Sequence, residues 1–67
     1  MKLTMKQIRQ LNGETQEETA KVLGVSTQSY NAYENFKRDT PLEQAVLFSR
    51  HFQVDLSDII FFEKELI

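Results

Sequence analysis

The sequence predicts an all-α protein of five helices in one domain. No segment of strand length alternates apolar and polar residues, which argues against a sheet. The one proline and both glycines fall between the helical segments. Three segments also begin with a helix-start signature, a threonine followed three residues later by Glu or Gln. Because 67 residues leave room for a single core, we expect residues 1–67 to form one domain.

The first two start signatures predict helices over residues 5–12 and 16–23. Thr4 and Thr15 can each cap a backbone N–H, while the Glu or Gln three residues later reaches back to the threonine. A glycine follows each helix and can adopt the left-handed conformation that ends it. Apolar residues at helical spacing give the inner faces, namely Met5, Ile8, Ala20 and Leu23, and the closing glycines are Gly13 and Gly24.

A third helix is predicted over residues 27–35, with Ser26 as its N-cap. Tyr30 and Tyr33 are spaced to lie on its inner side. The short joint Leu23-Gly24-Val25-Ser26 leaves a tight turn between the second and third helices, with Val25 filling it. Two short helices joined in this way form a helix-turn-helix, whose second helix projects from the protein body.

The fourth and fifth helices are predicted over residues 41–52 and 56–62. Thr40 begins the third capping box, and Pro41 suits the first helical position, where its missing N–H is not needed. Asp55 is the expected N-cap of the fifth helix. The expected inner residues are Leu42, Ala45, Phe48 and Phe52, then Leu56, Ile59 and Ile60, with Val54 in the turn between the helices.

Composition excludes several classes of function. Without cysteine there is no disulfide or Cys-ligated metal, and a cytoplasmic location fits best. The N-terminus lacks the apolar stretch of a signal peptide, and no apolar run is long enough for a membrane span. The lone histidine, His51, has the context of a surface residue, and no phosphate loop or spaced carboxylate set is present. We therefore expect no enzyme, cofactor, metal or small-molecule ligand.

The net charge of −2 counts mildly against a nucleic-acid partner. Residues 41–67 carry five acidic and two basic groups, whereas residues 1–40 carry five and six. The outer face of helix 27–35 is nevertheless polar, uncharged and short-branched, as entry into a DNA major groove requires. Composition alone favours the simpler interpretation, a helix that is merely solvated.

The run from Gly13 to Pro41 resembles the helix-turn-helix of the phage repressor and Cro family, also called the xenobiotic-response-element family. The resemblance rests on T-Q-E-E-T-A, L-G-V-S, Y-E-N and K-R at these mutual offsets. It implies a compact five-helix, lambda-repressor-like DNA-binding domain. It also implies a small Cro-like or prophage-type transcriptional regulator that binds double-stranded operator DNA, in which helix 27–35 reads the major groove.

The resemblance also implies roles for individual residues. Arg9 and Glu34 match a buried ion pair that locks the first helix onto the reading helix. The positions that match base contacts are Thr27, Gln28, Asn31 and Ala32. The positions that match phosphate contacts are Gln16, Ser29, Asn35, Lys37 and Arg38, with Lys2 and Lys6 as further candidates from their charge.

Four residues depart from the family pattern. Glu14 and Thr19 stand where relatives commonly have leucine, and we expect them to weaken the local core. Phe36 and Gln53 stand where relatives commonly have glycine. Phe36 adjoins Lys37 and Arg38, so it bears directly on the loop expected to follow the phosphates.

The C-terminal segment carries more apolar residues than one short helix can bury. Phe61 and Phe62 cannot both point inward, and one of them is either a lone exposed residue or part of an interface. We favour a weak homodimer on an operator with two-fold symmetry, through Leu56, Ile60, Phe61 and Phe62. The rival hypothesis is a repressor-fold protein-interaction module, antitoxin-like or anti-repressor-like, that does not bind DNA.

Overall fold

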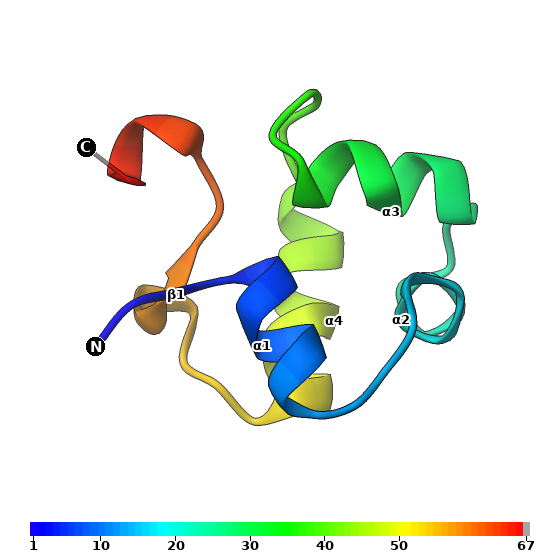
Figure 1. Cartoon of the computed structure of the whole chain (residues 1–67), viewed down its shortest axis with the longest axis horizontal. Helices are drawn as coiled ribbons and strands as arrows, with labels where there is room; N and C mark the ends of the chain where they lie inside the picture. Colours follow the sequence, from blue (N-terminus) through cyan, green and yellow to red (C-terminus); the bar gives the residue numbers. More distant parts are fainter. Residues whose placement is uncertain (67) are drawn as a thin grey trace.

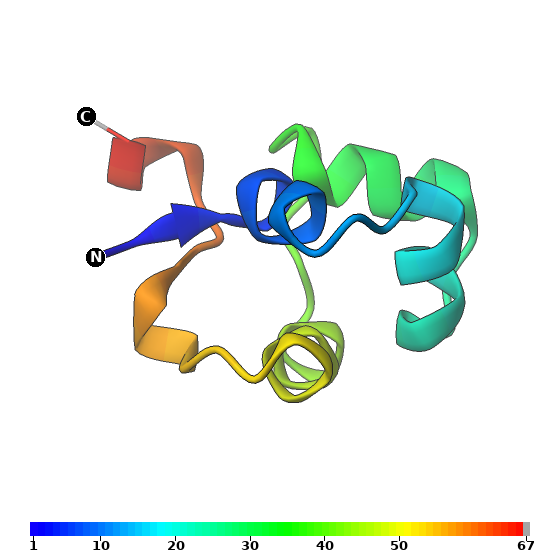
Figure 2. The same cartoon turned by 60° about the horizontal axis from the view of Figure 1, so that its bottom comes forward.

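A computed structural model of the chain describes residues 1–66. Within them lie four α-helices, α1 (Met5–Leu11), α2 (Gln16–Leu23), α3 (Thr27–Glu34) and α4 (Leu42–Phe52). Helix α2 packs against both α3 and α4. In Figure 1, α2 is seen end-on while α3 lies across the view, so the two helices meet at a large angle. In Figure 2, α3 again lies along one edge of the molecule, as the second helix of a helix-turn-helix does.

The first two capping boxes are confirmed, and the third is wrong. The Thr4 hydroxyl accepts a hydrogen bond from the Gln7 N–H, and the Thr15 hydroxyl accepts one from the Glu18 N–H. In α4, Pro41 itself is the N-cap and makes no side-chain cap bond. Thr40 is instead buried, because its hydroxyl turns inward toward the sulfur of Met5.

The expected fifth helix over residues 56–62 is wrong. The segment forms one 3₁₀ turn, η1 (Leu56–Asp58), then a short strand, β2 (Ile59–Ile60), and later a second 3₁₀ turn, η2 (Glu63–Leu66). Strand β2 pairs in parallel with β1 (Leu3–Thr4), so the all-α prediction also needs correction. The pairing places residues 3–4, near the start of the chain, beside residues 59–60 (Figures 1 and 2).

The chemistry of residues 59–62 explains this difference. Ile59 and Ile60 are β-branched and two phenylalanines follow, and such residues favour extended backbone. A strand also needs a partner, which Leu3 and Thr4 supply from the opposite end of the chain. Both isoleucines are buried in this arrangement. Leu56, Ile59 and Ile60 have the i, i+3, i+4 spacing of an apolar helix face, and this spacing led to the wrong helix prediction.

The core lies between α1, α2, α3, α4 and the strand pair. The turn residues Val25 and Val54 pack against it, as expected. Leu42 and Leu56 contradict their predicted inner positions, because they are 75% and 40% exposed. Leu42 is the first residue of α4, and both leucines line an open hollow instead of the core. The buried cluster consists of Met5, Ile8, Ala20, Leu23, Tyr30, Phe48 and Ile59.

All four helices end in the same way. After each, one residue has positive φ and donates its N–H three residues back, and the next residue donates five residues back, which is the Schellman motif. Gly13 and Gly24 occupy this left-handed position after α1 and α2. Phe36, with φ of 61°, and Gln53, with φ of 55°, occupy it after α3 and α4. Phe36 and Gln53 therefore occupy left-handed positions, where glycine is the favoured residue.

Replacing Gln53 with glycine is expected to stabilise the protein. Gln53 is exposed, and a left-handed conformation costs a residue with a Cβ about 1 kcal/mol. Gln53→Gly should therefore raise the free energy of unfolding by up to about 1 kcal/mol in urea titrations. Gly13→Ala is the matched control, because a Cβ there meets no atom within 4 Å, and it should lower stability by a similar amount. A less stable Gln53→Gly variant would contradict the argument.

Candidate nucleic-acid interface

Two buried tyrosines anchor α3 and set its outward face. Tyr30 and Tyr33 lie in the interior, with 0% and 5% of their surface exposed. The opposite side of the helix carries amide and hydroxyl groups. Thr27, Gln28 and Asn31 on this side are exposed. The helix therefore presents a polar, uncharged surface of the kind that can hydrogen-bond to base edges.

The remaining expected DNA contacts lie on or beside this face, although to different depths. Ala32 and Ser29 are half-buried, and the Ser26 hydroxyl caps the helix by accepting from the Ser29 N–H. Asn35, just after α3, is exposed and donates its side-chain amide to the Asn31 carbonyl. The exposed edge of the helix thus runs continuously into the loop that follows it.

Arg9 of α1 and Glu34 of α3 form a bidentate ion pair. The Arg9 Nε lies 2.7 Å from one Glu34 carboxylate oxygen, and Nη2 lies 3.1 Å from the other. The Glu34 side chain is completely buried and that of Arg9 nearly so. Burial alone would raise the pKa of Glu34, but the hydrogen bonds that its carboxylate accepts, those from Arg9 first among them, together with the charge of Arg9 hold the pKa below its usual range. The carboxylate in turn raises the pKa of Arg9.

The ion pair is enclosed by further groups. The Arg9 Nη1 donates to the backbone carbonyl of Glu14 at 2.7 Å, so the same guanidinium also ties down the loop before α2. Burial raises the pKa of the Tyr30 phenol well above its ordinary value, and this hydroxyl stays neutral. It makes no hydrogen bond to the described residues. Arg9 therefore fixes α1, α3 and the intervening loop relative to one another.

Gln16, the first residue of α2, connects this ion pair to the outer face of α3. Its side-chain nitrogen donates to Glu34 at 3.0 Å, and its side-chain oxygen accepts from Asn31 at 3.2 Å. The local spacing in the sequence gave no sign of the Gln16 to Asn31 contact, because it depends on how α2 and α3 pack.

Glu14 and Thr19, the two residues that depart from the family pattern near α2, are hydrogen-bonded to each other. The fully buried Thr19 hydroxyl donates to one Glu14 carboxylate oxygen at 2.8 Å. The other oxygen lies 2.5 Å from the Nε2 of His51, near the end of α4. A polar cluster thus stands at the two positions where we expected a weakened core, and it links α4 to the α1–α2 loop. His51 is mostly at the surface, but it is partnered.

The basic residues after α3 are held close to the helix. Lys37 and Arg38 are both exposed. The Arg38 guanidinium lies 3.3 Å from the Ser29 hydroxyl and 5.3 Å from the centre of the Tyr33 ring, over its face. Lys2 lies elsewhere and pairs with Glu65 of the C-terminal turn at 3.5 Å. Lys37 and Arg38 are therefore the cations placed next to the polar face.

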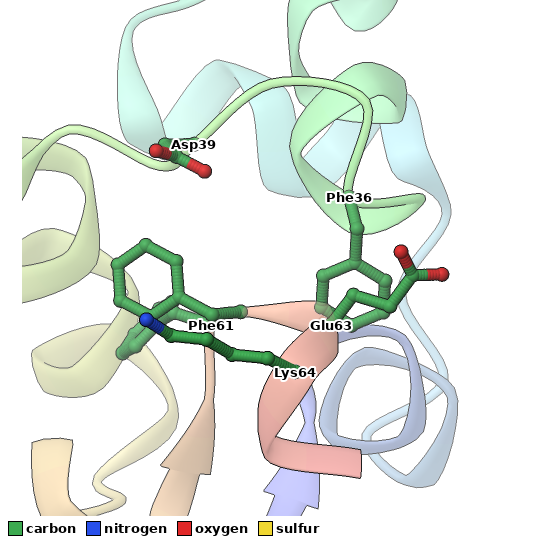
Figure 3. A pocket seen from close by; sticks show the side chains of 6 residues that line it. Phe36, Asp39, Phe61, Glu63 and Lys64 are labelled. Atoms are coloured by element: carbon green, nitrogen blue, oxygen red, sulfur yellow. The ribbon is translucent and has the colours of Figure 1, made fainter. Parts of the chain in front are cut away.

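Phe36 faces the C-terminal segment. Figure 3 shows its ring directed from the loop toward Glu63, while Asp39 lies across a hollow from Phe61 and Lys64. The hollow has a volume of about 330 Å³. The large Phe36 side chain thus makes the loop a neighbour of η2.

A second hollow, of about 400 Å³, opens on an apolar surface formed by α4 and the C-terminal segment. Leu42, Leu56 and Phe62 line it and are 75%, 40% and 42% exposed. We call these three residues the apolar patch. Phe61 also lines the hollow but packs partly against the core. Ile60, expected at the dimer interface, is buried within its own chain and offers almost no surface.

No helix in residues 1–66 is long and apolar enough to cross a membrane.

Comparison with known proteins agrees with this geometry. Residues 5–59 match a family described as helix-turn-helix. The chain is 40% identical over 65 residues to an uncharacterized HTH-type transcriptional regulator of Methanocaldococcus jannaschii, covering 97% of this chain and 98% of that protein. No solved structure matches the chain. The chain belongs to the Cro and repressor-type helix-turn-helix family.

Proposed function

We propose that this protein is a transcriptional regulator that binds double-stranded DNA sequence-specifically, with α3 in the major groove. The observation that carries the proposal is the outward face of α3, which is exposed, uncharged and held from beneath by two buried tyrosines. Membership of the helix-turn-helix family supports the same function. A compact, Cro-like regulator of this kind acts by occupying its operator.

The chemistry of α3 favours A·T pairs among the bases contacted. Gln28 can pair with adenine through its amide, and the methyl groups of Thr27 and Ala32 suit the thymine methyl. Residues 26–36 contain no Lys or Arg, the usual partners of guanine. Affinity then depends on phosphate contacts, for which Gln16, Ser29, Asn35, Lys37 and Arg38 are the candidates.

Two copies joined through the apolar patch would bind an operator with two-fold symmetry. The chain measures 28 × 24 × 20 Å, which is comparable to the roughly 34 Å that separates half-sites one helical turn apart. Exposed Leu42, Leu56 and Phe62 supply an apolar surface to bury between copies.

Selection of bound fragments from a random duplex pool tests the proposed function. We expect enrichment of one A·T-rich half-site motif, repeated with two-fold symmetry. Gel shifts of the selected duplex against random competitor, at low and physiological salt, then measure specificity. Absence of any enriched motif would overturn sequence-specific binding.

Gln28→Ala is expected to weaken binding to the selected operator by about 1 to 3 kcal/mol, because a bidentate base contact is lost. Binding to random duplex should stay unchanged, because α3 makes no specific contacts to base edges there. The measurement is a competition gel shift with both duplexes. Equal losses on the two would remove Gln28 from the base contacts.

Lys37→Ala should weaken binding to all duplexes alike. One phosphate contact fewer should flatten the dependence of log K on log salt by about one unit. Salt titrations of the wild type and the variant measure this slope, and Arg50→Ala, an exposed cation in the last turn of α4, is the charge control. A slope identical to that of the wild type would place Lys37 away from the phosphates.

The net charge of −2 favours a second candidate, a repressor-fold module that binds another protein and not DNA. The same gel shifts separate the two. Retention of neither specific nor random duplex at low salt would favour the interaction module.

A further inference from the structure

Hydrogen bonds are donated in one direction, from the surface of α3 through Gln16 to the buried ion pair. Glu34 is ionised against Arg9, so its carboxylate oxygens only accept. Gln16 must therefore turn its amide nitrogen toward Glu34, and Nε2 lies 3.0 Å from Oε1. This orientation places the Gln16 carbonyl oxygen on the side that faces Asn31.

Asn31 stands at the outer end of this relay. Because the Gln16 oxygen is an acceptor, Asn31 must donate to it, and its Nδ2 lies 3.2 Å away. The Asn31 side chain is exposed, and within residues 1–66 its Oδ1 accepts no hydrogen bond. Its carbonyl oxygen and its second N–H are therefore both available to a ligand.

We propose that the relay from Glu34 through Gln16 fixes the Asn31 amide so that it selects adenine over guanine at one operator position. This inference rests on the proposed function. Adenine presents an N6 donor and an N7 acceptor, which match the free oxygen and the free N–H of Asn31. Guanine presents two acceptors, N7 and O6, so the fixed Asn31 oxygen would meet an acceptor there, whereas an amide free to turn could donate its N–H to O6.

Turning the amide is opposed by Gln16. A flipped Asn31 would set its carbonyl oxygen against that of Gln16, so two acceptors would meet without a proton between them. Gln16 cannot flip in response, because its oxygen would then face the ionised Glu34. Gln16 is thus a positioning residue for Asn31. Its second amide hydrogen remains free for a phosphate, so its two roles are separable.

Gln16→Met tests the relay, because it removes the amide and leaves Asn31 and the ion pair in place. Dissociation constants of the full chain are measured for the selected operator with adenine or guanine at each position in turn. We expect the adenine preference to fall about tenfold at one position, the same one that Asn31→Ala relaxes. The double variant should lose nothing further there. A lost phosphate contact alone would weaken both duplexes equally and leave their ratio unchanged.

An unchanged ratio in folded Gln16→Met would overturn the relay, as would an Asn31→Ala variant that relaxes no position. In both cases the wild type still binds its operator, whereas failure of the proposed function leaves no binding to compare. NMR of the DNA-free protein gives an independent test. Cross-relaxation between the Asn31 amide protons and the Gln16 side chain is expected, and its absence would also overturn the relay.

Discussion

Arg9→Met is expected to lower the free energy of unfolding by about 3 to 5 kcal/mol, because it leaves a charged Glu34 buried without its partner. Within residues 1–66, the Gln16 amide would still donate to that carboxylate. A domain of this length has a total stability of roughly 3 to 10 kcal/mol, so the substitution should remove about a third of that stability or more. Circular dichroism with urea titration measures the loss.

Replacing both charged partners separates the cost of an unpaired charge from the worth of the pair. Arg9→Met combined with Glu34→Leu removes both charges and fills the space with apolar groups, and it should recover most of the lost stability. A double variant as unstable as Arg9→Met would show that packing by the Arg9 side chain, and not its charge, stabilises the fold. A single variant within about 0.5 kcal/mol of the wild type would contradict the argument itself.

The ion pair also makes the free energy of unfolding depend on pH. The folded pKa of Glu34 is depressed, so its contribution is complete above the ordinary pKa of a glutamate and is lost as the pH falls through the folded value. Acid titration should therefore destabilise the wild type in this window. The variant without both charges should lose that part of the dependence.

Local signals in the sequence predicted the features that depend on neighbouring residues. The capping boxes at Thr4 and Thr15 join groups three residues apart, and the buried tyrosines of α3 follow from helical spacing. These features define the helix-turn-helix and the outward face of its second helix. Most of the candidate site was accessible to sequence reasoning for this reason.

Features that depend on distant parts of the chain were not predictable in this way. Ile59 and Ile60 form a strand because Leu3 and Thr4 lie beside them, and no local pattern reports that partner. The hydrogen bond between Gln16 and Asn31 likewise depends on the packing of two helices. Even the two residues that replace glycine, Phe36 and Gln53, keep the left-handed turns, because the surrounding hydrogen bonds of the helix ends are retained.

Leu42→Glu is expected to weaken binding to an operator with two half-sites by at least about 100-fold, because it puts a charge into the proposed contact between copies. Leu42 is 75% exposed, so the change should leave the stability of a single copy within about 0.5 kcal/mol. Binding to a duplex with one half-site should stay nearly unchanged. Gel shifts with the two duplexes measure the difference, and sedimentation gives the stoichiometry.

Leu11→Glu is the matched control, because it adds the same charge at a leucine that is 76% exposed at the end of α1. Both variants repel phosphates to a similar extent, so a loss confined to Leu42→Glu isolates the contact between copies from simple electrostatics. Phe62→Glu, on the other side of the same hollow, should reproduce the loss. A wild type that sediments as a monomer both free and on the full operator would refute pairing through the apolar patch, and α3 would then read each half-site alone.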